Sequence, residues 1–174
     1  MKNRLTEMIL SGNSRFNTDL VAAHIGSDEV LFGELIFLMH NGKTPVPQRA
    51  AWIMTAVTDK YPWLILPYIN EIVERIPSYR HPGIVRSVLR QFCQIDFSEE
   101  ITGEIFELSY NFLNDTKQPI AIRVYAMQIL FNISEKEPDL KNELKLVLEN
   151  LLDDISSAGI ASRAGKLLMI LNKN

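Results

Sequence analysis

The sequence has little of what catalytic, metal and disulfide sites are built from. It contains one cysteine, Cys93, and three scattered histidines. A single cysteine excludes an intrachain disulfide framework and a thiolate zinc cluster, and the histidines lack the paired spacing of metal ligands. The eight glycines are spread along the chain and form no phosphate-binding loop. We therefore expect no cofactor, no metal and no enzymatic activity.

Long apolar runs and a strong net charge are missing as well. Apolar stretches such as Trp63–Pro67 and Leu35–Met39 are far shorter than the roughly 20 residues of a membrane span. The first ten residues lack the pattern of a secretion signal. A net charge of −3 gives no global attraction to nucleic acid or to an anionic membrane. We expect a cytoplasmic location and no membrane contact.

What is present is a regular spacing of arginines. The chain is 47% hydrophobic and 22% charged, as in a folded domain. Four arginines recur 37, 37 and 40 residues apart, and the residues after each have the apolar spacing of a helix. The arginines are Arg49, Arg86, Arg123 and Arg163. The spacing predicts that they open helices over Ala50–Val57, Ser87–Ile95, Val124–Ile133 and Ala164–Leu171.

A second helix is predicted after each of the first three. The starts are Tyr61-Pro62, Phe97-Ser98 and Glu137-Pro138, since proline is tolerated in the first turn and Ser98 is a good N-cap. Pro67 would interrupt the first of these helices. We expect a separate turn over Pro62–Leu66 and a regular helix over Pro67–Ile76.

These helical hairpins have the length and pattern of a HEAT or armadillo repeat. The runs Pro82–Arg86 and Pro119–Arg123 resemble the start of a HEAT first helix. Gln48–Trp52 and Ser157–Arg163 are similar to segments of small bacterial HEAT-like proteins. The resemblance implies an all-α fold, a short right-handed α-solenoid of stacked antiparallel helical hairpins, and it implies no activity.

The predicted organisation is a single domain over residues 1–174. Hairpin repeats are expected over 45–80, 81–116 and 117–155. Residues 1–44 break the period and predict atypical capping helices over Asn17–Ile25 and Ser27–His40, with another short helix within Met1–Leu10. Residues 156–174 predict a C-terminal capping helix.

Two features of the repeats favour structural roles. The arginines could form a phosphate-binding row, but we favour a ladder in which each one bonds the backbone or an acidic residue of its neighbour, as Asp115 and Asp154 would allow. Cys93 aligns with Ala56, Leu130 and Ile170, which predicts a core position.

The second helices carry the candidate partner surface. The sequence places Glu100, Glu104 and Glu107 on one of them, and Lys141 and Lys145 on the next. Because the second helices of such solenoids line a concave binding surface, we expect a noncatalytic protein-interaction or scaffold module. A basic peptide or protein would suit this acidic surface, and two copies could also pair through an exposed capping helix.

The alternative is nucleic-acid binding. Arg75, Arg80, Arg86 and Arg90 form a basic stretch with no acidic residue between Glu74 and Asp96. HEAT-like DNA glycosylases resemble this fold and use a basic channel, whereas the concave side expected here is acidic. We favour the protein-binding interpretation.

Overall fold

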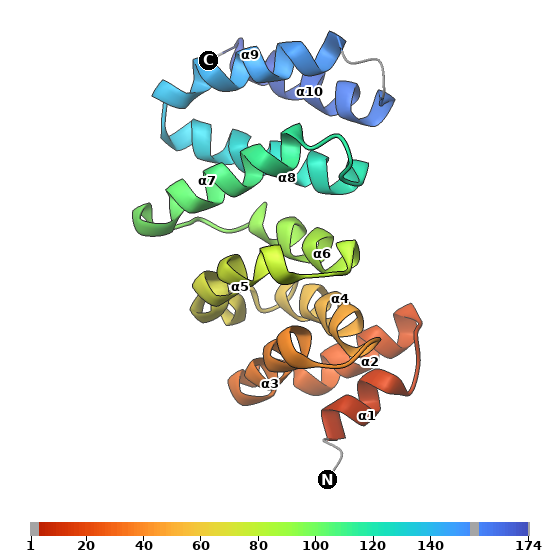
Figure 1. Cartoon of the computed structure of the whole chain (residues 1–174). Coiled ribbons are helices and arrows are strands. Elements are labelled where there is room, and N and C mark those ends of the chain that lie inside the picture. Colours follow the sequence, from red (N-terminus) through yellow and green to blue (C-terminus); the bar gives the residue numbers. More distant parts are fainter. Residues whose placement is uncertain (1–3, 154–156, 174) are drawn as a thin grey trace. The chain divides into compact units, whose positions relative to one another are not determined.

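The computed structural model describes residues 4–153 and 157–173, apart from the side chain of Asp153, and the regular secondary structure of these residues is helical throughout (Figure 1). The chain divides into two compact units, Met1–Gln91 and Phe92–Asn174. We call them the N-terminal and C-terminal units and describe each by itself. The all-α solenoid class predicted from the sequence is confirmed.

The N-terminal unit is built around α4. Its elements are α1 (Arg4–Leu10), α2 (Arg15–Ile25), α3 (Glu29–Asn41), α4 (Val46–Thr58), the 3-10 helix η1 (Pro62–Tyr68), α5 (Ile69–Arg75), the short 3-10 helix η2 (Ile76–Ser78), and α6 (Pro82–Phe92), which reaches the division between the units. Helix α4 packs against α1, α2, α3 and η1. The Asp28 carboxylate accepts from the backbone N–H groups of Val30 and Leu31 and so caps α3.

Pro67 has the predicted effect on the following hairpin. It lies inside η1, and the regular helix α5 begins only at Ile69. A proline has no N–H for the α-helical hydrogen bond and its ring crowds the preceding turn. The tighter 3-10 helix therefore extends two residues beyond the expected turn.

The C-terminal unit has α8 at its centre. Its elements are α7 (Glu99–Asn114), α8 (Ile120–Lys136), α9 (Asp139–Asp153) and α10 (Ala158–Leu171). Helix α8 packs against the other three, and α9 packs against α10. The core gathers Met127 and Leu130 of α8, Leu148 of α9 and Leu167 of α10. Burial of these side chains, at about 1.5–3 kcal/mol each, holds the layers together.

The arginines do not open their helices. The four helices begin earlier, at Val46, Pro82, Ile120 and Ala158. In the first three a proline lies at or beside the start, where its fixed φ and missing N–H suit the first turn. The helix expected over Ser87–Ile95 also ends sooner, at Phe92. The arginine spacing was therefore correct as a period but placed the helix starts about one turn late.

The arginine ladder is confirmed at two positions. Arg49 Nη1 donates to the carbonyl oxygens of Ile9 at 3.2 Å and of Gly12 at 3.0 Å. Arg123 is buried, and its Nε donates to the carbonyl oxygen of Leu113 at 2.9 Å. Arg86 is exposed and Arg163 is half-buried. Asp154 lies outside the described residues.

Candidate functional site

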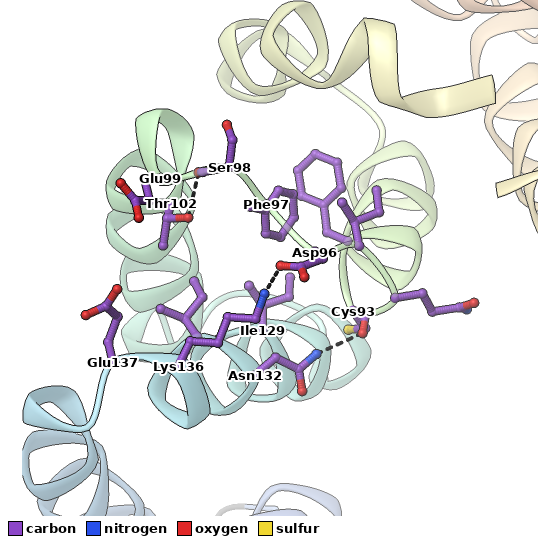
Figure 2. Close-up of a pocket in the computed structure, with 14 residues that line it drawn as sticks. Cys93, Asp96, Phe97, Ser98, Glu99, Thr102, Ile129, Asn132, Lys136 and Glu137 are labelled. Carbon is purple, nitrogen blue, oxygen red and sulfur yellow. Dashed lines mark hydrogen bonds and ion pairs between the residues drawn. The ribbon is translucent and has the colours of Figure 1, made fainter. Parts of the chain in front are cut away.

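A hollow of about 640 Å³ lies where the segment that joins α6 to α7 passes over α8. Figure 2 shows its labelled side chains converging from that segment, from the start of α7 and from α8. The lining consists of residues 92–99 together with Thr102, Ile129, Asn132, Ile133, Lys136 and Glu137. All of these residues belong to the C-terminal unit.

A second hollow of about 520 Å³ continues from the first along α7 and the start of α9. It is lined by Glu99, Thr102, Gly103, Phe106, Ile133, Glu137, Asp139 and Leu140. Glu99, Thr102, Ile133 and Glu137 line both hollows, so the two adjoin. We call the two together the acidic groove.

The acidic groove combines an apolar lining with carboxylates. Phe97, Ile129, Phe106 and Leu140 supply apolar surface. The charged lining residues are the acids Asp96, Glu99, Glu137 and Asp139 and the base Lys136. Lys136 forms an ion pair with Asp96 (Figure 2). Three of the four carboxylates thus have no cation among the lining residues, and the groove carries a local negative charge.

Hydrogen bonds hold the wall of the groove in place. Asn132 Nδ2 donates to the carbonyl oxygen of Cys93 at 2.8 Å, and Gln128 Nε2 donates to Asn132 Oδ1 at 2.6 Å. At the start of α7 the Thr102 hydroxyl donates to the Ser98 carbonyl at 2.8 Å. Ser98 is the N-cap residue as predicted, although its hydroxyl makes no capping bond. The joining segment is therefore held by hydrogen bonds near both of its ends.

Cys93 lies in the wall of the groove. Its Sγ lies 3.5 Å from the Tyr125 carbonyl oxygen. The side chain is only half-buried, so the prediction of a fully buried core position was wrong. Cys93 comes directly after the last residue of α6, Phe92, and both residues line the hollow. Within residues 4–153 and 157–173 no group of three or more His, Cys, Asp or Glu is placed to hold a metal ion.

A family model described as a HEAT repeat domain matches residues 1–171. The chain belongs to the HEAT-repeat family. No curated protein and no solved structure matches it. HEAT repeats commonly serve as protein-interaction scaffolds. No helix in the described part of this HEAT-repeat chain is long and apolar enough to cross a bilayer.

The HEAT-repeat chain separates the predicted partner residues. Glu100, Glu104 and Glu107 are exposed along α7, next to the residues of that helix that line the groove. Lys141 and Lys145 on α9 are half-buried and do not line the groove, and Lys141 pairs with Glu135 at 3.2 Å. None of these five residues lines the groove; the three glutamates and Lys141 each neighbour a lining residue in the sequence, whereas Lys145 does not.

Sequence reasoning missed Gly103 and Phe106 as lining residues. Gly103 lies in the middle of α7, where glycine costs about 1 kcal/mol relative to alanine. A Cβ added there would meet no atom within 4 Å, so the position faces open space. The available signal in the sequence was a glycine in the middle of a predicted helix, about one turn from Glu99 and from Phe106.

The basic stretch of the alternative interpretation is partly neutralised. Arg90 Nη1 and Nη2 each lie 3.0 Å from an oxygen of Asp59. Burial alone would raise the pKa of Asp59, but hydrogen bonds from Arg90 and Gln91 and the charge of Arg90 hold it below its ordinary value. Arg75 and Arg86 are exposed, and Arg80 borders a smaller hollow of about 260 Å³.

Proposed function

We propose that this HEAT-repeat protein is a noncatalytic binding module that holds a basic segment of a partner protein in the acidic groove. The observation that carries the proposal is the union of two hollows whose described lining combines apolar side chains with four carboxylates and a single cation, Lys136. An apolar centre with a charged rim is the usual anatomy of a protein-binding surface.

The apolar lining determines what kind of side chain enters. Ile129 and Ile133 are buried in α8 and close one side, while Phe97 and Phe106 are half-buried around it. A leucine or aromatic side chain that fills such a hollow removes apolar surface from water, at about 25 cal/mol per Å². We therefore expect the partner segment to place an apolar anchor here.

The carboxylates determine the charge of the partner. Glu99 and Glu137 line both hollows, and Asp139 extends the acidic rim along α9. Glu100, Glu104 and Glu107 add negative charge on the adjoining side of α7. Such a field speeds the encounter with lysine- and arginine-rich segments and repels acidic ones. The partner is a basic segment that carries at least one apolar anchor.

The first test introduces an uncharged side chain into the acidic groove. Gly103→Leu places a side chain into open space, and leucine is a better helix former than glycine, so the variant should stay folded. We expect it to weaken binding of a fluorescent Lys/Leu amphipathic peptide at least about tenfold, or about 1.4 kcal/mol. Fluorescence anisotropy measures the affinity. Asn111→Leu, an exposed position on the same helix, is the matched control.

A second pair of variants tests the charge. Glu99→Lys combined with Glu137→Lys should abolish binding of the basic peptide at low salt and remove its salt dependence. An acidic peptide of the same pattern should not bind in the groove. Equal affinity of the native chain and Gly103→Leu for the basic peptide would refute the proposal.

A further inference from the structure

A third hollow of the C-terminal unit, about 540 Å³, lies between α8 and α10. It shares no lining residue with the acidic groove. We call it the basic hollow. The residues that matter here are Gln128 and Phe131 of α8 and Arg163, Lys166, Met169 and Ile170 of α10, with Lys173 just beyond the helix.

The basic hollow exposes large apolar side chains. Met169 is 61% and Ile170 44% exposed. Their counterparts one repeat earlier, Ile129 and Leu130, are both 1% exposed. The exposed face of α10 therefore carries apolar side chains at positions that are buried in α8.

The charged residues that line the hollow, among those the structure describes, have a single sign. Arg163, Lys166 and Lys173 line it, and no carboxylate does so among the described residues. Two further polar atoms of the lining, Arg163 Nε and Gln128 Oε1, are buried without a hydrogen-bond partner in the part of the chain that the structure describes. Arg49 and Arg123, at the equivalent repeat position, bond to backbone carbonyl oxygens. Arg163 Nε and Gln128 Oε1 are therefore lining atoms whose hydrogen-bonding capacity is unused among the described residues.

We propose that the basic hollow docks an acidic amphipathic helix of a partner protein. Lys166, Met169, Ile170 and Lys173 recur at three- and four-residue spacing and follow one side of the α10 segment. A second helix laid along this stripe would place apolar side chains over Met169 and Ile170 and carboxylates beside the cations. Lys166 and Lys173 meet its carboxylates at the rim, where charge sets register and specificity.

Charge argues against a symmetric pairing of two copies through this face. An isologous contact brings the same patch of both copies together. Lys166 and Lys173 of each copy would then approach like charges. The acidic helix of another protein avoids this repulsion. The proposal is independent of the acidic groove because it concerns a different surface and a partner of opposite charge.

The experiment uses the full chain and a synthetic Glu/Leu amphipathic peptide of about 16 residues, labelled for fluorescence anisotropy. We expect binding that weakens with salt. Lys166→Glu combined with Lys173→Glu should weaken it at least about tenfold. Met169→Ser combined with Ile170→Ser should do the same, and because both side chains are exposed, circular dichroism should show an intact fold. Lys60→Glu with Lys117→Glu, both exposed, is the control of equal charge change.

The experiment distinguishes binding at the basic hollow from binding at the acidic groove. Gly103→Leu should leave affinity for the acidic peptide unchanged, so failure of the acidic groove would not affect this result. No binding, equal binding of a Lys/Leu peptide to this face, or full affinity after the charge reversal would overturn the proposal. Sedimentation that shows self-association weakened by both Gly103→Leu and the Lys166 and Lys173 reversals would identify a second copy as the occupant and overturn it as well.

Discussion

The two compact units use their polar side chains in different ways. In the N-terminal unit Arg49 binds backbone carbonyls, His40 bonds Tyr79, and Arg90 pairs with Asp59. In the C-terminal unit the acidic groove and the basic hollow present charges of opposite sign to open space. The three polar contacts of the first unit join its own elements, whereas the charged residues of the two hollows line open space in the second unit.

Helix α8 shows how the second unit separates two such surfaces. Ile129, Asn132 and Ile133 line the acidic groove, whereas Gln128 and Phe131 line the basic hollow. The hydrogen bond from Gln128 to Asn132 passes from one side to the other. One helix therefore supports both hollows while its apolar residues keep them apart.

The largest expected effect concerns the buried or half-buried arginine that bonds backbone carbonyl oxygens in each unit, Arg49 in the first and Arg123 in the second. Arg49→Met and Arg123→Met keep the aliphatic stem but leave the carbonyls of Gly12 and Leu113 without their charged donors. We expect each to lower the free energy of unfolding by about 2–3 kcal/mol. Arg86→Met, an exposed position of the same repeat column, should stay within about 0.5 kcal/mol. Urea denaturation measures all three.

If Arg86→Met and Arg123→Met changed the free energy of unfolding equally, the comparison would fail. The arginines at equivalent repeat positions would then contribute equally to stability, whether or not they bond a carbonyl oxygen. A large effect in only one of Arg49→Met and Arg123→Met would instead confine the structural arginine to one unit.

A smaller effect is a loss of stability at low pH that we expect in the N-terminal unit and not in the C-terminal unit. His40 Nδ1 and the Tyr79 hydroxyl lie 2.8 Å apart, and the side chain of His40 is fully buried. Burial lowers the pKa of His40 below its ordinary 6.5, with Glu71 opposing and Arg75 adding to the shift. As pH falls below 6.5 the unfolded chain takes up a proton that the folded chain does not. Stability present above this pH is therefore lost on acidification.

The measurement compares the native chain with His40→Gln at about pH 7.5 and about pH 5.5. Hydrogen exchange should show that protection in α3 falls at the lower pH while protection in α8 holds. The glutamine variant should lose less stability between the two pH values. An equal loss in both proteins would show that His40 does not set the pH response of the N-terminal unit.

Local signals in the sequence predicted the helices but not the hollows. Pro62 at the start of η1 and Ser98 before α7 act within their own segments, so both could be predicted directly from the sequence. The partner of Arg90 could not, because Asp59 lies 31 residues away along the chain. The basic stretch looked free of acidic residues for that reason.

The repeat alignment also had a limit. It correctly placed Leu130 in the core and wrongly suggested the same for Ile170 and, in part, Cys93. Equivalent positions in the aligned repeats lie on the same side of their helices, whereas the burial of each residue depends on what packs against that side. At α10 nothing in the described residues covers Ile170, and at the end of α6 the groove opens beside Cys93.

The smallest expected effect concerns nucleic acid. Asp59 neutralises Arg90 within the stretch formed with Arg75, Arg80 and Arg86, so a phosphate backbone would meet fewer uncompensated cations than the sequence indicates. We expect no gel shift of duplex DNA by the native chain and at most weak binding at low salt by Asp59→Asn. Arg80→Glu combined with Arg86→Glu should abolish even that binding. Tight, salt-dependent binding by the native chain would reverse the comparison, because the N-terminal unit would then carry the binding surface.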